Sequence, residues 1–418
     1  MRPIAANRFY GWTVVAAAFV IAIFGWGLGF YGPPVYLKAV QDARGWSVTL
    51  VSTAVTLHFL TGAIVVANLP RLHSAFGLPV TTIGGAAILS VGVVGWAAAR
   101  EPWQLFLATM FSGAGWVTLG AAAINAMVSP WFAAKRPAAL SMAFNGASVG
   151  GIVFSPLWVA LIGALGFLNS TLVVGVVTTC VVAALAASIL TRTPASMGLA
   201  VDGLDAAVAR TTSIAAPRGK VDRLARDPAF VTLSLGMTLG LFAQAALVAH
   251  LFSLLVPAMG AQAAGLVVGL ATVAAILGRT LVGWLMPPDA DRRVVASLNY
   301  AIQIAGCVAL LLAGGANIPL LVLGVILFGV GIGNVTSLPP LIAQAEFAPD
   351  DVPRVVALAT SIAQAIYAFG PAAFGLLRDV TSGGESTGAA PALFVAATII
   401  QVLAIAAYLL GRGAHSRR

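Results

Sequence analysis

Charged residues are scarce in this sequence. Only 8% of its 418 residues are Asp, Glu, Lys or Arg, whereas 60% are hydrophobic, and the mean hydropathy is +0.99. A chain with so little charge cannot cover the surface of a water-soluble domain, and its polar residues are too sparse for the alternating strands of an outer-membrane barrel. The composition therefore predicts an all-α polytopic membrane protein.

Cysteine is also scarce, and the usual signatures of enzymes are missing. Cys180 and Cys307 fall in separate apolar runs, so neither a disulfide framework nor a metal site is supported, and we interpret both as lipid-facing or core-facing small residues. The sequence has no nucleotide-binding loop, metal-ligand cluster or nucleophile–base pair. We therefore expect no enzymatic activity and no cofactor, with a membrane-embedded enzyme or a channel as the alternatives from other classes.

The apolar runs predict twelve membrane spans. A helix needs roughly 20 residues to cross the hydrocarbon core, and each run is about that long or longer. The first run exceeds a signal-peptide length and lacks a clean small-residue cleavage site, so we expect it to stay in the protein. The predicted spans are residues 11–37, 47–69, 78–99, 103–128, 138–163, 168–190, 228–257, 263–286, 294–314, 318–345, 352–378 and 390–411.

The basic residues set the predicted orientation. With loops assigned alternately, seventeen Lys and Arg residues, including Arg293, fall on the side that holds both termini and four, including Arg378, on the other. The positive-inside rule then places both termini in the cytoplasm of a multi-pass protein of the bacterial cytoplasmic (inner) membrane. The net charge of +9 does not indicate nucleic-acid binding, because the cations lie in short loops between spans. We expect a monomer in the lipid bilayer.

Two halves of the sequence resemble each other. The polar segment 191–226 reads as a cytoplasmic linker between six-helix bundles at 1–190 and 227–418. Phe132 and Phe347 lie 215 residues apart in similar contexts, as do Pro156 and Pro371. A repeat with equal orientation predicts two pseudo-symmetric bundles about an axis along the membrane normal, with a binding site near the midplane at their interface.

Arg279 is a cation in the interior of a predicted span. It lies in the stretch 265–286, where a charge costs on the order of 2.5–3.5 kcal/mol on insertion scales. No carboxylate lies in the middle of any other apolar run, so we interpret the missing counter-charge as an anionic substrate. In the repeat, Arg279 corresponds to Ala63. The alternative is that Arg279 snorkels to the cytoplasmic boundary or caps backbone carbonyls.

Other polar and aromatic residues in the spans are candidates for a substrate cavity. His250 could carry a coupled proton or donate to a carboxylate oxygen, or it could bond a neighbouring carbonyl. The hydroxyl of Tyr31 could reach a substrate oxygen, or the ring could simply pack. Four amides suggest a polar lumen or interhelical hydrogen bonds, and three aromatic residues suggest its apolar walls or core packing: Asn125, Asn145, Asn334 and Gln364, then Trp26, Trp116 and Tyr367.

Two further residues are assigned structural roles. His58 has no counterpart of Arg279 near it in the repeat, so we expect it to serve packing. Glu346 falls at the cytoplasmic end of a span, and we expect it to pair with loop cations such as Arg354.

Residues 131–150, WFAAKRPAALSMAFNGASVG, resemble the monocarboxylate-porter and oxalate-exchanger branch of the major facilitator superfamily. The shared pattern is an aromatic-Phe pair, two basic residues, Pro and a G-x-x-x-G helix leading to Pro: Phe132, Lys135, Arg136, Pro137, Gly146, Gly150 and Pro156. Gly11-Trp12, and Arg279 followed by Gly283, are similar to the same branch. The resemblance implies the major facilitator fold, alternating access, Arg279 as the substrate arginine, and Lys135 and Arg136 as loop residues that act in gating.

The sequence also departs from that branch. Ala275 stands where proton-coupled members often have Asp, and Phe30 where they often have Lys. The oxalate exchangers have a second cation in helix 11, where this chain has only Gln364 and Tyr367. Ser74 replaces the acidic residue of the loop between helices 2 and 3. We therefore expect a secondary transporter of a small, monocarboxylate-like organic anion, with or without a proton, and drug or metabolite efflux as the alternative.

Overall fold

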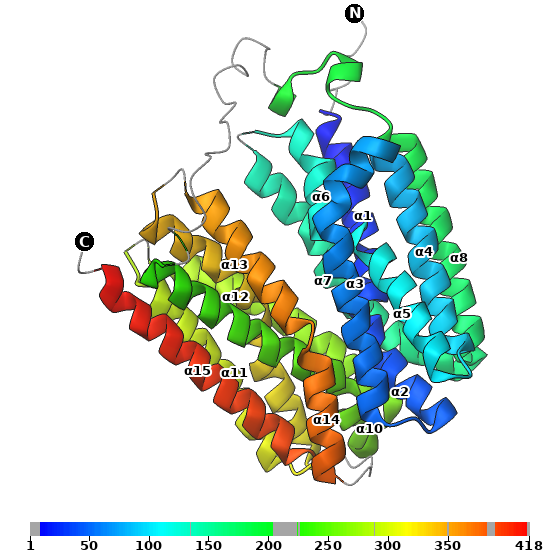
Figure 1. The fold of residues 1–418 in the computed structure, drawn as a ribbon, viewed down its shortest axis with the longest axis vertical. Coiled ribbons are helices and arrows are strands. Elements are labelled where there is room, and N and C mark those ends of the chain that lie inside the picture. The colour runs from blue at the N-terminus through cyan, green and yellow to red at the C-terminus, as the bar shows by residue number, and fades with distance from the viewer. Residues whose placement is uncertain are drawn as a thin grey trace, which may run out of the picture. The chain divides into compact units, whose positions relative to one another are not determined.

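The structure is a computed structural model, and it describes residues 9–133, 135–203, 224, 226–287, 289–348, 351–382 and 389–415. These residues are helical or irregular and include no β-strand. The first half contains α1 (Gly11–Gly29), α2 (Gly32–Arg44), α3 (Val48–Phe76), α4 (Leu78–Ala98), α5 (Pro102–Val117), α6 (Ala121–Val128), α7 (Arg136–Leu165) and α8 (Phe167–Leu185). The second half contains α10 (Pro228–Leu285), α11 (Arg292–Leu312), α12 (Ile318–Glu346), α13 (Val352–Tyr367), α14 (Gly370–Ser382) and α15 (Pro391–His415), all visible in Figure 1.

The described residues form eleven helical segments that are long and apolar enough to cross a membrane. One of them, α10, is 58 residues long and has a non-helical joint at Gly260, where φ is 76°. The predicted spans 228–257 and 263–286 lie on either side of this joint, so α10 supplies two crossings. The all-helical polytopic fold with twelve spans is therefore confirmed.

Proline explains where several spans are interrupted. The first predicted span, 11–37, is two helices joined at Phe30 and Tyr31, and the second of them begins at Gly32-Pro33-Pro34. The eleventh span is likewise divided into α13 and α14, and α14 begins at Gly370-Pro371. Proline suits the first turn of a helix, because the N–H that it lacks would have no partner there.

Helix starts in the second half carry the residues expected of N-caps. The Asp227 carboxylate accepts from the Ala229 N–H, and the Asn317 amide oxygen accepts from the Leu320 N–H. Asp291 accepts from the N–H groups of Arg293 and Val294 at the start of α11. Burial alone would raise the pKa of Asp291, but hydrogen bonds from Arg412 and from these two N–H groups hold that pKa below its usual value.

The helices form two compact units by contact. Unit 1 comprises Met1–Gly32, Thr61–Phe154 and Leu161–Ala215. Within it α1 and α7 approach closely, because a Cβ at Gly150 would lie 2.6 Å from the carbonyl oxygen of Ile23. Unit 2 comprises Pro33–Leu60, Ser155–Ala160 and Ala216–Arg418. In unit 2, α11 packs side by side with α12 and α15 (Figure 1) over a core that includes Met237, Tyr300, Leu338 and Tyr408.

The repeat seen in the sequence also governs helix packing inside each unit. In unit 1, a Cβ at Gly62 of α3 would lie 2.9 Å from the side chain of Val117 on α5. In unit 2, a Cβ at Gly278 of α10, 216 residues later, would lie 2.9 Å from the side chain of Val330 on α12. Small residues at matched positions let both helix pairs approach closely, and more closely at Gly278, where a Cβ would lie 2.1 Å from the Val330 carbonyl oxygen.

Candidate functional site

Arg279 lies near the end of α10 and is half-buried in unit 2. Its Nε donates a 3.1 Å hydrogen bond to the carbonyl oxygen of Gly333 on α12. The absence of a side chain at Gly333 permits this approach, because a Cβ there would lie only 3.2 Å from that Nε. The carbonyl contact considered as an alternative to substrate binding is therefore present. It also orients the planar guanidinium by fixing one edge of it to the backbone of α12.

Asn334 follows Gly333 and is buried in a cluster of amides. Its Nδ2 donates to Oδ1 of Asn299 at 3.0 Å, and Nδ2 of Asn299 donates to the Gly331 carbonyl at 3.2 Å. Nε2 of Gln401 donates to Oε1 of Gln303 at 3.4 Å in the same unit. Asn334 was a candidate from the sequence, whereas Asn299, Gln303 and Gln401 were not. They could have been found as amides within apolar runs. The repeat also distinguishes them, because the positions 215 residues earlier hold no amide: they are Gly84, Ile88, Leu119 and Ala186.

His250 is fully buried in the part of α10 that precedes the joint at Gly260. Its Nε2 lies 3.0 Å from the carbonyl oxygen of Pro371, so Nε2 carries the proton and donates. Its Nδ1 is buried without a hydrogen-bond partner among the residues that the structure describes. The Ser253 hydroxyl donates to the His250 carbonyl at 2.8 Å, and Arg378 Nη1 donates to the same hydroxyl oxygen at 2.7 Å.

Arg378 was counted among the loop cations, and its assignment to a solvated loop is wrong. The residue is only 3% exposed. The eleventh span was predicted to end at residue 378, but α14 continues to Ser382, which places Arg378 inside the last turns of the helix and against α10. The sequence offered no sign of this, because a cation at the end of an apolar run reads as a boundary residue.

The other candidate residues of unit 2 lie on α13. Gln364 and Tyr367 are half-buried there, and the ring of Tyr367 meets that of Phe59 with centroids 5.9 Å apart. His58, the neighbour of Phe59, is buried and stacks edge-on against it, with centroids 5.1 Å apart. Arg279, His250, Asn334, Gln364 and Tyr367 therefore all belong to one compact unit.

The remaining candidates belong to unit 1. Tyr31 occupies the joint between α1 and α2, with its ring centroid 5.1 Å from that of Phe30. Asn125 and Asn145 are exposed on α6 and α7, and Oδ1 of Asn125 accepts from the Ser129 hydroxyl at 2.7 Å. Trp26 is half-buried and Trp116 is buried.

The basic pair Lys135 and Arg136 is exposed, as expected for a loop. The buried carboxylate of Asp202 accepts from the backbone N–H groups of Ala133 at 3.0 Å and Lys135 at 3.3 Å. Asp202 has a left-handed φ of 61°, a conformation that Asp tolerates better than most residues. The loop is thus fixed through its backbone, which leaves the two basic side chains in solvent.

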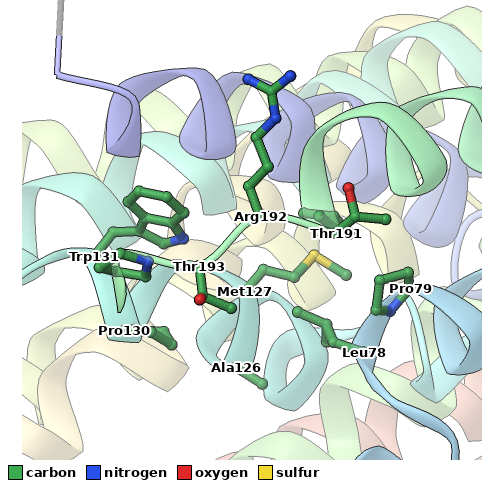
Figure 2. A pocket seen from close by; sticks show the side chains of 11 residues that line it. Leu78, Pro79, Ala126, Met127, Pro130, Trp131, Thr191, Arg192 and Thr193 are labelled. Atoms are coloured by element: carbon green, nitrogen blue, oxygen red, sulfur yellow. The ribbon is translucent and has the colours of Figure 1, made fainter. Parts of the chain in front are cut away.

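A pocket of about 180 Å³ lies in unit 1 and contains none of the predicted site residues. Figure 2 shows the guanidinium of Arg192 pointing away from the other lining side chains, and it lies over the ring of Tyr10 at 5.2 Å. The lining residues are Leu78, Pro79, Ala126, Met127, Pro130, Trp131, Leu190, Thr191, Arg192, Thr193 and Pro194. The interior is mainly apolar, so it does not match an anion site.

Glu346 does not pair with Arg354 as expected. It forms an ion pair with Arg293, at 2.6 Å from Nε to Oε1 and 2.7 Å from Nη2 to Oε2. Arg293 was counted as a loop cation, yet it is 1% exposed, because it starts α11 facing the end of α12. In the repeat these residues correspond to Leu78 and Trp131, which line the pocket of unit 1.

The repeated, proline-interrupted membrane helices define a polytopic membrane protein. Residues 14–371 match the family described as the Major Facilitator Superfamily. The chain belongs to this family, and it is therefore a secondary transporter and not an enzyme.

Relatives refine this assignment only slightly. Over 178 residues the chain is 29% identical to "Monocarboxylate transporter 11" of Mus musculus, a match that covers 40% of this chain and 38% of that protein. It is similar to the crystal structure of a mutant of the nucleoside transporter NupG, with a TM-score of 0.73 at 10% identity over 95% of this chain and 99% of that one. A bacterial homolog of the human lysosomal transporter Spinster, inward-facing and occupied, gives a TM-score of 0.66 at 18% identity, covering 98% of each chain. Both structures support the fold alone.

Proposed function

We propose that the protein carries a small organic anion with one carboxylate across the membrane by alternating access, and that Arg279 is the residue that binds the carboxylate. The observation that carries the proposal is a half-buried guanidinium inside a membrane helix, oriented through Nε by the carbonyl of Gly333. A planar guanidinium presents paired donors that match the two oxygens of a carboxylate, which a lysine cannot do.

Two further observations support a carboxylate substrate. The mouse protein that matches part of this chain is named for monocarboxylates, and the family resemblance in residues 131–150 indicates the same branch. Gly333 is adjacent to Asn334, so an amide lies next to the turn of α12 that holds the arginine. One guanidinium presents its paired donors to one carboxylate, which favours a monoanion over a dianion. The proposal also keeps, each within its own unit, Gln364, Tyr367, Tyr31, Asn125 and Asn145 as substrate-binding residues and Lys135 and Arg136 as gating residues.

His250 is the proposed coupling group. Its buried Nδ1 is an acceptor without a described partner, so it is the atom at which an added proton would sit. A proton on Nδ1 makes the ring cationic and strengthens the hydrogen bond that Nε2 donates to the Pro371 carbonyl in the first turn of α14. Proton-coupled transport then follows if this bond is made in only one of the two transport states. A transporter in which His250 stays neutral would instead work by uniport or exchange.

A thermal-shift screen of the purified protein tests the substrate class. Small monocarboxylates, dicarboxylates and uncharged drug-like compounds are compared, each with the parent and with Arg279→Ala. A ligand at 100 times its Kd should stabilise the parent by about 2.7 kcal/mol. We expect a monocarboxylate to raise the Tm of the parent and to leave that of Arg279→Ala unchanged. A response only to uncharged compounds would reject the anion proposal in favour of efflux.

A further inference from the structure

Helices α3 and α14 are joined by a polar seam inside unit 2. The N–H of Thr49 on α3 donates to Oδ2 of Asp379 on α14 at 2.8 Å, and the N–H of Ala372 on α14 donates to Oγ1 of Thr56 on α3 at 3.1 Å. Between these contacts, a Cβ at Gly375 would lie 2.6 Å from the side chain of Ser52. The seam therefore has no room for a larger side chain at its centre.

The two hydrogen bonds cap the two helices reciprocally. α3 begins at Val48 and α14 at Gly370, so both donors are first-turn N–H groups without a partner in their own helix. Asp379 adds a negative charge at the positive end of the 29-residue helix α3. Each helix thus satisfies one first-turn N–H of the other, and separating them would leave the N–H groups of Thr49 and Ala372 without these acceptors.

The adjacent residue fixes α14 to the second half of the chain. Arg378 donates to Ser253 of α10 at 2.7 Å, whereas Asp379, one residue on, reaches α3. The last turns of α14 therefore hold a helix from each half of the sequence. A rocking of the two halves, as alternating access requires, must break the contacts to α3 and can leave those to α10 intact.

The repeat contains a matching contact without the charge. Gly265 of α10 packs on α7, where its Cβ would lie 3.2 Å from the Ser155 carbonyl and 3.0 Å from the Val159 side chain. In this register Asp379 corresponds to Ala164 and Thr49 to Ala264. The packing is symmetric, but the carboxylate cap occurs at one of the two positions only.

We propose that Asp379 is a gate residue, whose cap on α3 holds the two halves together at this face and sets how often the face opens. The proposal goes beyond the proposed substrate, since it concerns the opening of the transporter and holds for any cargo. Its partner on α3 is the N–H of Thr49, Thr56 provides the reciprocal cap on α14, and Arg378 is the anchor that keeps Asp379 in place. Asp379 acts by positioning α3 and does not contact the substrate.

Thiol labelling of the purified protein in nanodiscs tests the gate. Thr49→Cys, introduced after Cys180→Ser and Cys307→Ala, places a thiol at the seam where the Thr49 hydroxyl is buried and keeps the backbone N–H that Asp379 accepts from, and the rate of its reaction with a hydrophilic maleimide reports opening. Replacing a helix cap by Ala typically changes stability enough to shift an equilibrium by about 2- to 30-fold. We expect Asp379→Ala to speed labelling by that factor, and Asp379→Asn, which keeps a cap oxygen, to speed it less.

Two variants separate the gate from general damage. Thr56→Val removes the reciprocal cap at nearly equal volume and should also speed labelling. It therefore tests the gate even if Asp379→Ala does not fold. Asp42→Asn changes an exposed carboxylate paired with Lys38 on α2 and should leave the rate as it was. Equal labelling of Asp379→Ala, Thr56→Val and the parent would overturn the gate. The monocarboxylate should still raise the Tm of Thr56→Val. The labelling rates therefore test the gate alone and the thermal shifts test the anion proposal alone, so either can be rejected without the other.

Discussion

Arg293 and Glu346 form a two-point ion pair, with N–O distances of 2.6 and 2.7 Å, that ties the start of α11 to the end of α12. Arg293 also donates to the carbonyl oxygens of Ala229 at 2.9 Å and Tyr408 at 3.3 Å. One guanidinium therefore connects α10, α11, α12 and α15 at one end of unit 2. The corresponding positions of unit 1 hold a leucine and a tryptophan beside a pocket.

Glu346→Gln should destabilise the protein strongly. It would leave the buried Arg293 without its counter-charge, and removing one partner of a buried ion pair typically costs about 3–5 kcal/mol. Asp42→Asn, which breaks the exposed pair with Lys38, should cost about 1 kcal/mol or less. The Tm values of both variants in detergent provide the measurement. A Glu346→Gln protein as stable as Asp42→Asn would show that the other hydrogen bonds of Arg293 suffice.

Arg279→Lys should impair substrate binding without preventing folding. Lysine keeps the charge but loses the paired donors and the Nε bond to Gly333. Loss of a charge-assisted hydrogen bond costs about 1.5–3 kcal/mol, which predicts an apparent affinity roughly ten- to a hundredfold weaker. Ligand-induced thermal shifts across a concentration series give this affinity. Near-normal affinity in Arg279→Lys would reject the paired-donor role and favour snorkelling, for which lysine serves equally well.

His250→Gln tests proton coupling. The glutamine amide can still donate to the Pro371 carbonyl, which His250 Nε2 contacts at 3.0 Å, but it cannot take up a proton. We expect uptake to lose its pH dependence, and exchange of labelled substrate to persist. Uptake and exchange in proteoliposomes at several pH values measure both. His58→Gln, at a second buried histidine, is the matched control, and an unchanged profile in His250→Gln would exclude His250 as the coupling group.

Cysteines at Ala195 and Ala43 test the predicted orientation. Both positions are exposed, and the seventeen-to-four distribution of cations places the first in the cytoplasm and the second outside. Each cysteine is introduced into a variant without the two native cysteines and expressed in cells. An impermeant maleimide should label Ala43→Cys in intact cells and Ala195→Cys only after permeabilisation. Labelling of both from outside would contradict the twelve-span topology with internal termini.

The sequence by itself determined the helical class, the spans, many of their interruptions and the repeat. Hydrophobic runs longer than about 20 residues leave a bilayer chain few alternatives, since backbone polar groups must be satisfied within the helix. Prolines such as Pro33 and Pro371 lie at the starts of new helices, and Asp227, Asp291 and Asn317 cap others, so local sequence explains these starts once the structure shows where they are. Arg279 was also identifiable, because a cation within an apolar run is conspicuous without any knowledge of its neighbours.

Only the tertiary structure decided which polar groups meet. Glu346 and its partner are 53 residues apart, and Thr49 and Asp379 are 330 apart, so no local pattern relates them. Arg293 and Arg378 lie at span ends, where solvated and buried cations look alike in sequence, and both proved buried because a neighbouring helix covers them. Helix packing brings such groups together at distances of about 3 Å, and that geometry depends on the shape of every contacting side chain, not on the period of one helix.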